Sequence, residues 1–446
     1  MNNHKSASAI QILLAALAAV GLGLSLIAAR QVSAQKISKL EIEQGRNMLS
    51  NVKSELKKNY YDPTFHGMEI EERFKLADEK MKNAESNGQL FGIIAQVLLE
   101  LNDSHTAFVP PMRASRVEYG WQMKAVGADC YVSAVKPGSD AEAKGLKVGD
   151  KVLSIDRRPV DRTKLWLANY LYYLLRPQPG MTVAVQKPDG QQQQIVIQAK
   201  VREGKKVLEG DFDFRNLMLD AQEEDRLSRH RFYEPSDDVL IWKMPQFDLS
   251  EDEVDSKIGK FRNRKALILD LRGNPGGYVT TLERLAGYFF AGDVKLADFK
   301  GRKEMKPSIA KGHSDKAFKG QLIVLLDGES SSAAEVFARV MQLEKRGTVI
   351  GDRSSGMVMR SRYYPLQTGA VNLILFGMSV TDADLIMADG KSLEHVGVTP
   401  DELLLPTPED MAAGRDPVLA HAASLVGIKL GPDKAGALFP LEWRSR

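Results

Sequence analysis

Residues 266–277 have the sequence Ala266-Leu267-Ile268-Leu269-Asp270-Leu271-Arg272-Gly273-Asn274-Pro275-Gly276-Gly277, an apolar run followed by a tight turn. The run has the length expected of a buried strand, and the glycines and the proline end it. A second apolar run at 322–326 is followed by a polar turn at 327–332 and a helical pattern at 333–343. Strands that alternate with helices in this way predict a largely parallel sheet covered by helices.

On either side of this pattern, the spacing of apolar, charged and glycine residues changes. These changes predict a mixed α/β protein of several parts. Residues 35–115 have apolar positions at helical spacing and are expected to form an N-terminal helical segment. Residues 116–202 have short β-like runs between glycines, which predicts a small β domain. The charged stretch 203–238 is expected to be a connector, and 239–405 the α/β core. Residues 406–446 are expected to form a helical tail.

The composition of the 446 residues is that of a globular protein, with 43% hydrophobic and 27% charged residues. Lys and Arg number 61 against 58 Asp and Glu, and the net charge of +3 predicts no nucleic-acid partner. Cys130 is the only cysteine, which excludes zinc knuckles, iron–sulfur clusters and an intrachain disulfide. Since the sequence also has no metal-ligand motif such as H-E-x-x-H, we expect neither a metal nor another cofactor.

The first 34 residues have the pattern of a secretory signal. Met1–Lys5 carries one positive charge, residues 6–29 are uncharged and mostly apolar, and Val32-Ser33-Ala34 offers a small-residue cleavage site. The apolar run also approaches the length that spans a bilayer, so an uncleaved membrane anchor is the alternative. In both cases we expect the rest of the chain to be exported, to the periplasm or outside the cell. The second case adds association with the membrane.

Two turns follow predicted strands and carry groups suited to catalysis, because functional groups collect at the carboxyl ends of parallel strands. In the first turn, no side chain shields the backbone amides of Gly276 and Gly277. In the second, Ser332 stands at the start of a predicted helix, next to unpaired N–H groups and the positive end of the helix dipole. Such amides can stabilise the oxyanion that forms when a serine attacks a carbonyl. The alternative is purely structural, with an N-cap serine and a glycine turn.

A serine nucleophile needs a base, and two of the seven histidines stand in suitable positions. His105 lies in the polar turn Asn102-Asp103-Ser104-His105 that ends a helical stretch, and His395 stands beside Glu394 near the end of the core. The residues alone leave the choice between these two histidines open.

Taken together, these segments resemble the C-terminal processing, or tail-specific, serine peptidases. The resemblance covers most of the mature chain and rests on five stretches that follow the family's order: Leu101–Thr106, Gly145–Val160, Ile268–Gly277, Ser330–Glu335, and Glu394–Asp401 with the preceding Asp389-Gly390. The second stretch is similar to the most recognisable part of a PDZ domain, so residues 116–202 are expected to be PDZ-like. The resemblance implies a parallel-rich α/β peptidase core into whose chain this domain is inserted.

The resemblance also implies roles for individual residues. The nucleophile falls on Ser332, and the oxyanion donors fall on the backbone N–H groups of Ala333 and of Gly276 or Gly277. A PDZ domain binds the end of a peptide as an added strand, with the peptide carboxylate in a nest of backbone amides. The stretch Tyr119-Gly120-Trp121-Gln122-Met123 is the substrate-binding candidate for this nest.

One position departs from the pattern of the family members that use a Ser–Lys dyad. Where those enzymes have a lysine, this chain has Met357, and methionine cannot accept a proton. The related tricorn-type branch uses Ser, His and Glu, with a serine before the histidine. Ser104-His105 and Glu394 match that set, so the resemblance is closer to this branch. It implies that His105 is the base for Ser332 and that Glu394 orients the imidazole, directly or through a neighbouring hydroxyl.

We therefore expect an exported serine endopeptidase that cleaves unstructured or C-terminal segments of proteins through an acyl-enzyme. Its partners are expected to be protein or peptide substrates with unstructured tails. Because Met357 replaces the dyad lysine, the alternative is a catalytically inactive, peptidase-like PDZ adaptor that binds protein tails.

Overall fold

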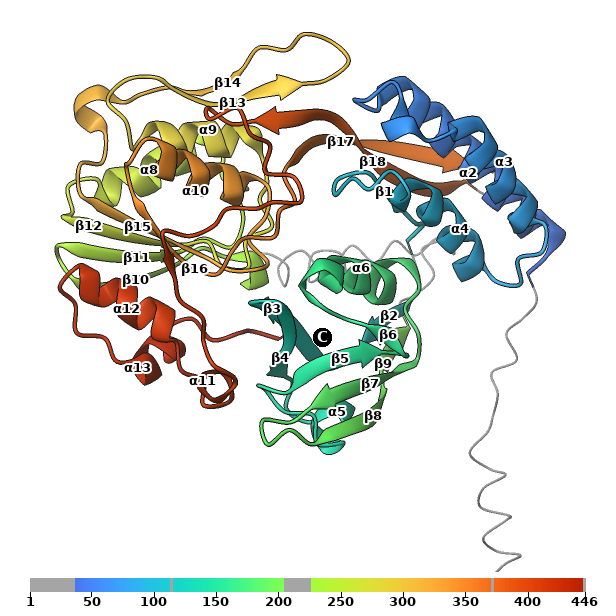
Figure 1. Ribbon diagram of the computed structural model, residues 1–446, viewed down its shortest axis with the longest axis horizontal. Helices are drawn as coiled ribbons and strands as arrows, with labels where there is room; N and C mark the ends of the chain where they lie inside the picture. Colours follow the sequence, from blue (N-terminus) through green and yellow to red (C-terminus); the bar gives the residue numbers. More distant parts are fainter. Residues whose placement is uncertain (1–36, 113–114, 204–225, 370–372, 444–446) are drawn as a thin grey trace, which may run out of the picture.

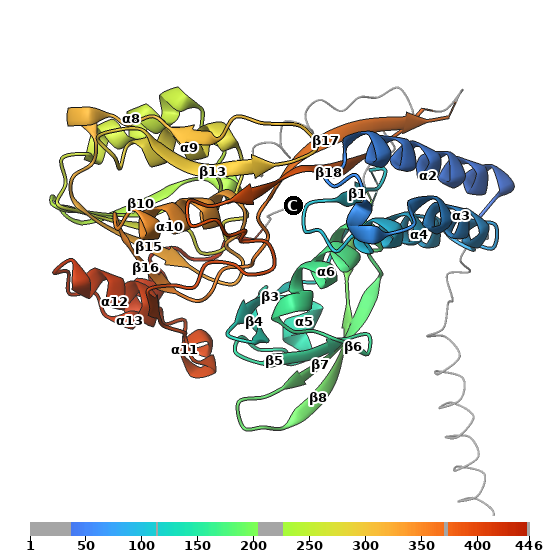
Figure 2. The same cartoon turned by 45° about the horizontal axis from the view of Figure 1, so that its top comes forward.

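The computed structural model describes residues 37–112, 115–203, 226–369 and 373–443. The predicted secretory signal and most of the predicted connector lie outside the described residues. An α/β core lies at one end of the molecule, a group of N-terminal helices at the other, and a small β domain below the two (Figures 1 and 2). In the described part of the chain we find no helix whose length and apolar character would let it cross a membrane.

The core contains a six-stranded sheet in the order β10-β11-β12-β15-β16-β19. Only the pair β10–β11 is antiparallel, and each of the other neighbouring pairs is parallel. The predicted parallel-rich α/β core is therefore confirmed. The strands are β10 (Arg231–Ser236), β11 (Val239–Lys243), β12 (Ala266–Asp270), β15 (Gln321–Leu326), β16 (Thr348–Gly351) and β19 (Glu402–Leu403).

Strand β10 corrects one prediction, because it lies inside the charged stretch expected to be a connector. Its side chains alternate between half-buried and exposed, as an edge strand with one solvated face requires. The charged residue Arg231 stands on its half-buried face, and Glu234 stands on its exposed face. The charges of this segment hid a strand that pairs with β11 and packs against the core through Tyr233.

Both faces of the core sheet are covered by helices (Figure 1). Side chains alternate along each strand, so Trp242, Leu269 and Val324 pack on one face, while their neighbours Ile241, Ile268 and Ile323 pack on the other. The first face is covered by α8 (Glu251–Phe261), α9 (Val279–Gly287) and α10 (Ala333–Leu343), and the second by α12 (Pro417–Leu425) and α13 (Pro432–Ala437).

The turn after β12 is tied to the C-terminal helices by ion pairs. Arg272 donates to Asp270 and to Asp416, which is the N-cap of α12, at 2.8 and 2.7 Å. The cationic neighbours Arg272 and Lys243 hold the pKa of the buried Asp270 carboxyl below its usual range. These charged residues thus hold the turn in place, as their position in the sequence suggests.

A second, antiparallel sheet joins the core to the N-terminal helices. It contains β1 (Ala107–Val109), β13 (Val294–Lys300), β14 (Ser308–Ala310), β17 (Met359–Thr368) and β18 (Ile374–Ile386). The long hairpin β17–β18 was not expected from the sequence. Its far end packs with Phe376 and Met378 against α2 (Lys39–Asn59), α3 (Ile70–Met81) and α4 (Asn87–Leu99) (Figure 2). Strand β1 starts two residues after His105 and pairs with β18, which fixes this histidine relative to the core.

The small β domain has a sheet in the order β3-β4-β5-β7-β8, with β3 at one edge. The last two strands of this sheet, β7 and β8, form an antiparallel hairpin. The strands are β3 (Trp121–Val126), β4 (Asp129–Val135), β5 (Lys151–Ile155), β6 (Arg158–Pro159), β7 (Gly180–Gln186) and β8 (Gln192–Gln198), and β2 (Ser115–Glu118) pairs with β9 (Lys200–Glu203) where the domain joins the rest.

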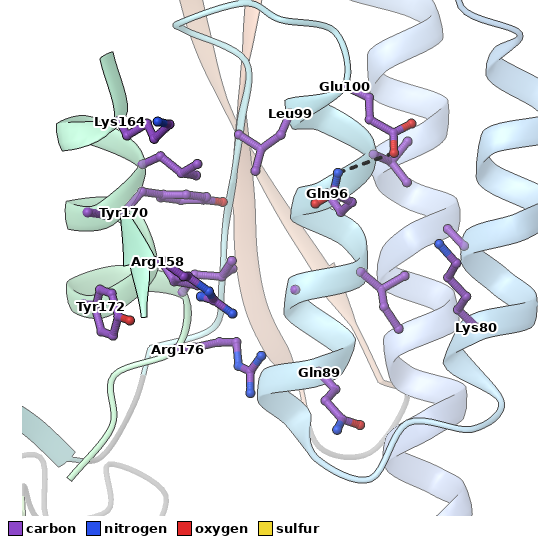
Figure 3. Close-up of a pocket in the computed structure, with 18 of the residues that line it drawn as sticks. Lys80, Gln89, Gln96, Leu99, Glu100, Arg158, Lys164, Tyr170, Tyr172 and Arg176 are labelled. Carbon is purple, nitrogen blue, oxygen red and sulfur yellow. Dashed lines mark hydrogen bonds between the residues drawn. The ribbon is translucent and has the colours of Figure 1, made fainter. Parts of the chain in front are cut away.

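The domain meets the N-terminal helices around a hollow. A cavity of about 670 Å³ lies between α4 and the helical segment formed by α6 (Leu165–Asn169) and η3 (Tyr170–Leu175) (Figure 3). The stem of Arg176 lies against Gly88 and Gly92 of α4 on one side of this hollow. Tyr170 closes the contact at the other side by donating to the carbonyl of Phe108 at 2.6 Å.

Candidate active site

Ser332 stands in the turn between β15 and α10 with an unusual backbone conformation. Its φ of 53° and ψ of −118° are rarely adopted by residues other than glycine. Gly276 lies directly against it, since a Cβ there would come within 2.7 Å of the Ser332 Cβ and 2.9 Å of the Ala333 nitrogen. Strained backbone of this kind concentrates at functional sites. The two predicted turns therefore meet, and only a glycine fits at position 276.

The N–H groups around Ser332 are suited to an oxyanion site. Among the described residues, no acceptor faces the backbone N–H of Ala333, at the first turn of α10, or that of Gly277. The N–H of Gly276 instead donates to the side chain of Asn274 at 2.8 Å. Of the two predicted glycines, Gly277 is thus the one with a free donor, while Gly276 supplies the close approach.

Glu394, Ser104 and His105 form a hydrogen-bonded chain. The Ser104 hydroxyl donates to Oε2 of Glu394 at 2.8 Å and lies 2.7 Å from Nδ1 of His105. The Ser104 backbone N–H donates to Oε1 of Glu394 at 2.9 Å. Because a hydroxyl has one proton and gives it to Glu394, His105 must donate from Nδ1. Nε2 of the neutral imidazole is then left as a proton acceptor.

Burial shifts the pKa values of His105 and Glu394. It lowers the pKa of His105, an effect that the nearby Asp103 carboxylate opposes. Burial also raises the pKa of Glu394, against which act the N–H groups of Ser104 and Val358 and the Ser104 hydroxyl. His105 is therefore neutral at pH 7, the state in which it can accept a proton.

Ser332 and Glu394 are each hydrogen-bonded to one of two consecutive residues, Met357 and Val358. The N–H of Ser332 donates to the carbonyl of Met357 at 2.9 Å, and the N–H of Val358 donates to Glu394 at 2.8 Å. Within the described residues, Ser332 and His105 share no hydrogen bond. Such bonds are often long before substrate binds and tighten in the complex. Ser332 and the hydrogen-bonded residues Glu394, Ser104 and His105 are thus linked through the adjacent residues Met357 and Val358.

Met357 lines a cavity of about 530 Å³, which Ser331 and Ser104, the neighbours of Ser332 and His105 in sequence, also line. No lysine is among the described residues that line it. Its cations are Arg162, paired with Asp352 at 2.8 Å, and Arg353, and a guanidinium does not give up its proton. His395 is exposed at the rim, where its Nε2 lies 2.9 Å from the carbonyl of Asn102. Nε2 of His395 also lies 3.6 Å from Oε1 of Glu394, but of the two candidate histidines His105 is the one joined to Glu394 through the Ser104 hydroxyl.

Glu335 is a residue whose importance the sequence analysis missed. Its buried carboxylate accepts from the N–H groups of Ser332, Gly356 and Met357 and from the hydroxyl of Ser354, at 2.5 to 3.1 Å. Burial raises the pKa of Glu335 to about 7 despite these four donors. The only signal in the sequence is its spacing, three residues after Ser332, which is that of a capping box. Glu335 is a positioning residue that joins the nucleophile to the loop 354–357.

The predicted substrate-binding stretch lies at the edge strand of the β domain. Tyr119, Gly120, Trp121, Gln122 and Met123 line a cavity of about 620 Å³ together with Tyr173 of η3. The Tyr119 and Trp121 side chains are buried in the domain core, so this stretch offers its backbone to a ligand. We call this cavity the β3 groove.

The β3 groove borders the cavity that Met357 lines. Glu329 and Asn169 line both cavities. Burial and the neighbouring Asp327 raise the pKa of Glu329 to about 8. A chain bound along β3 can therefore continue into the cavity that contains Met357 and Ser104 without leaving the surface of the molecule.

Comparison with known protein families assigns both the small β domain and the α/β core. Residues 238–404 match Peptidase family S41, and residues 112–165 match the PDZ domain. The small β domain is thus a PDZ domain, and the α/β core is the peptidase domain.

The full chain is similar to processing proteases. It is 24% identical to a tail-specific protease from Haemophilus influenzae over 66% of this chain and 42% of that protein. It is 23% identical to a carboxyl-terminal-processing protease from Picosynechococcus over 82% of this chain and 85% of that protein. The crystal structure of mature CPAF has the same fold, with a TM-score of 0.62, 16% identity and coverage of 84% and 95% of the two chains.

The chain spans less than half of the length of the Haemophilus tail-specific protease. Both processing proteases and a tricorn protease homologue are among its relatives, so the comparisons do not distinguish the two branches. The matched domains and their order lead to one assignment: residues 238–404 are a peptidase domain of family S41, preceded by a PDZ domain, in a chain similar to carboxy-terminal processing proteases.

Proposed function

We propose that the chain is a serine endopeptidase that uses Ser332, His105 and Glu394. The observation that carries the proposal is the chain of hydrogen bonds from Glu394 through Ser104 to His105, next to a serine with a strained backbone. A histidine base explains how the site works with Met357 at the place of the dyad lysine. The geometry therefore supports the tricorn-type set over the Ser–Lys dyad.

The reaction follows from the positions of these groups. Nε2 of His105 takes the proton of the Ser332 hydroxyl as its oxygen bonds to the substrate carbonyl carbon. The N–H groups of Ala333 and Gly277 stabilise the oxyanion, and Glu394 stabilises the imidazolium through Ser104. His105 then gives the proton to the leaving amine, and the peptide bond breaks to leave an acyl-enzyme. Water, deprotonated by His105, attacks the ester and releases Ser332.

The substrates we propose are proteins with unstructured or C-terminal tails. Strand β3 is the edge strand of its sheet among the described strands, and PDZ domains bind chain ends by adding a strand at such an edge. The names of the relatives, tail-specific and carboxyl-terminal-processing protease, agree with this substrate class. We further propose that the chain is exported, on the pattern of its first 34 residues.

Digestion of casein by the purified full-length chain tests the proposal. We expect Ser332→Ala and His105→Ala to abolish the activity, with no lysine needed at position 357. Ser361→Ala is the matched control on β17, outside the site, and should retain the parent rate. A parent that is inactive, but gains activity in Met357→Lys, would contradict the proposal and favour the tail-binding adaptor.

A further inference from the structure

The last described residues of the chain lie at the β3 groove. Glu442 and Trp443 line the same cavity as Gly120, Trp121 and Met123. These two residues follow the helix α13 of the peptidase domain, so a segment of one domain reaches the peptide site of the other. We call Leu441–Trp443 the strap.

Charged contacts hold the strap in place. Arg226 forms an ion pair with Glu442 and donates to the carbonyl of Trp443 at 2.8 Å. Arg229 pairs with the other oxygen of the Glu442 carboxylate at 2.5 Å. The ammonium of Lys136 lies 6.0 Å from the centre of the Trp443 ring, and the Lys136 backbone N–H donates to the carbonyl of Gly120. The strap is therefore bound beside the predicted carboxylate nest by an acidic and an aromatic side chain.

The strap does not use the strand edge of the groove. Among the described strands β3 pairs only with β4, and the strap residues belong to no strand. The Arg226 and Arg229 side chains are 34% and 55% exposed, and ion pairs with this exposure contribute little. A peptide that adds to β3 would gain main-chain hydrogen bonds that the strap lacks. The strap is thus displaceable by a peptide with similar side chains.

We propose that the strap competes with incoming tails for the β3 groove, and that the groove prefers tails in which an acidic residue precedes an aromatic residue. When the strap leaves, the acidic residue of the tail takes the place of Glu442 beside Arg229 and Arg226. The inference deepens the proposed function, because it names the substrate class, and it rests on that function only for the fate of the bound tail.

Peptide binding to the full-length Ser332→Ala chain tests the inference without cleavage. The probe is a fluorescent heptapeptide with the sequence of residues 437–443, Ala-Leu-Phe-Pro-Leu-Glu-Trp, and the readout is fluorescence anisotropy. A site that is closed most of the time binds weakly in proportion to its open fraction. We therefore expect Trp443→Ala, added to this chain, to tighten the dissociation constant about tenfold. Glu442→Gln should tighten it by a smaller factor.

Two controls test whether the change in peptide affinity is specific to the groove and to the acidic residue of the probe. Leu425→Ala, an exposed apolar residue of α12 outside the groove, should bind the probe as the parent does. A probe with Lys in place of its Glu should bind about tenfold more weakly to the Trp443→Ala chain, since it repels the two arginines. Thermal melting of each variant confirms folding.

The inference is wrong if Trp443→Ala binds the probe as weakly as the parent or more weakly. Trp443 would then be part of the binding site and not a competitor of the peptide. Equal binding of the Glu and Lys probes would overturn the acidic preference. Because Ser332→Ala cannot cleave, these outcomes are independent of whether the parent is a peptidase.

Discussion

The two halves of the catalytic site differ in how they are built. The nucleophile half, with Ser332, Gly276 and Glu335, comes from two turns of one parallel sheet and is held by many short-range backbone contacts. The base half joins Ser104 to Glu394 across 290 positions of sequence, through side chains and a three-residue strand. The nucleophile half is held by backbone contacts within one sheet. The base half, in contrast, depends on the packing of the N-terminal segment against the core.

Among residues other than Ser332 and His105 themselves, the largest effect is expected in the nucleophile half, from Glu335→Gln. The amide group would face two of the four donors that the carboxylate accepts, and each unpaired buried donor costs about 1–3 kcal/mol. We expect kcat/KM to fall about 10³-fold, with a lower melting temperature. Glu344→Gln, at the exposed end of the same helix, is the control. A Glu335→Gln enzyme within threefold of the parent would show that the carboxylate does not hold the site.

The base half should respond differently, through kcat alone. Ser104→Ala removes the hydroxyl between Glu394 and His105 and leaves the imidazole without its orienting partner. We expect kcat to fall about 100-fold with little change in KM, since the interaction acts in the transition state. Ser104→Thr keeps a hydroxyl and should restore most of the rate. Steady-state kinetics on a peptide substrate measures both, and a rise in KM at constant kcat would contradict the assignment.

The pH profile should report the base half. Burial lowers the pKa of His105 below its ordinary value of 6.5, so the imidazole stays neutral to lower pH than a free histidine. The acid limb of kcat/KM should therefore have its midpoint below pH 6.5. The folded chain binds fewer protons here than the unfolded chain, so the contribution of His105 to stability is present above pH 6.5 and is lost on acidification. A profile governed by a group that titrates above pH 8 would indicate a lysine base.

The smallest effect is expected from Met357→Lys. The residue accepts the Ser332 backbone N–H through its own backbone carbonyl, which a lysine would keep, and the proposed base is His105. We expect kcat/KM to change by less than about threefold, because a second base adds little where one is positioned. The change of activity is measured on casein beside the parent. A large gain would mean that the base half is not functional as it stands.

The same difference explains how much the sequence alone could predict. The strands β12 and β15 and the helix α10 were predicted because each is a local pattern, and the turns between them followed. No spacing links Ser104 with Glu394, and only the resemblance to a family suggested that they meet. The hairpin β17–β18 was missed because its residues are buried and exposed in no simple alternation, with charges and a proline inside it. Glu335 was missed because a buried glutamate after a serine has the spacing of an ordinary cap.

The central claim is that His105 activates Ser332 in place of a lysine. The most direct measurement is the second-order rate at which a fluorophosphonate labels Ser332 in the parent chain and in His105→Gln, read by mass spectrometry. The account predicts labelling of Ser332 in the parent and a rate at least about 100-fold lower in His105→Gln. Equal rates in the two chains, or a rate that rises only when Met357 is changed to lysine, would contradict it.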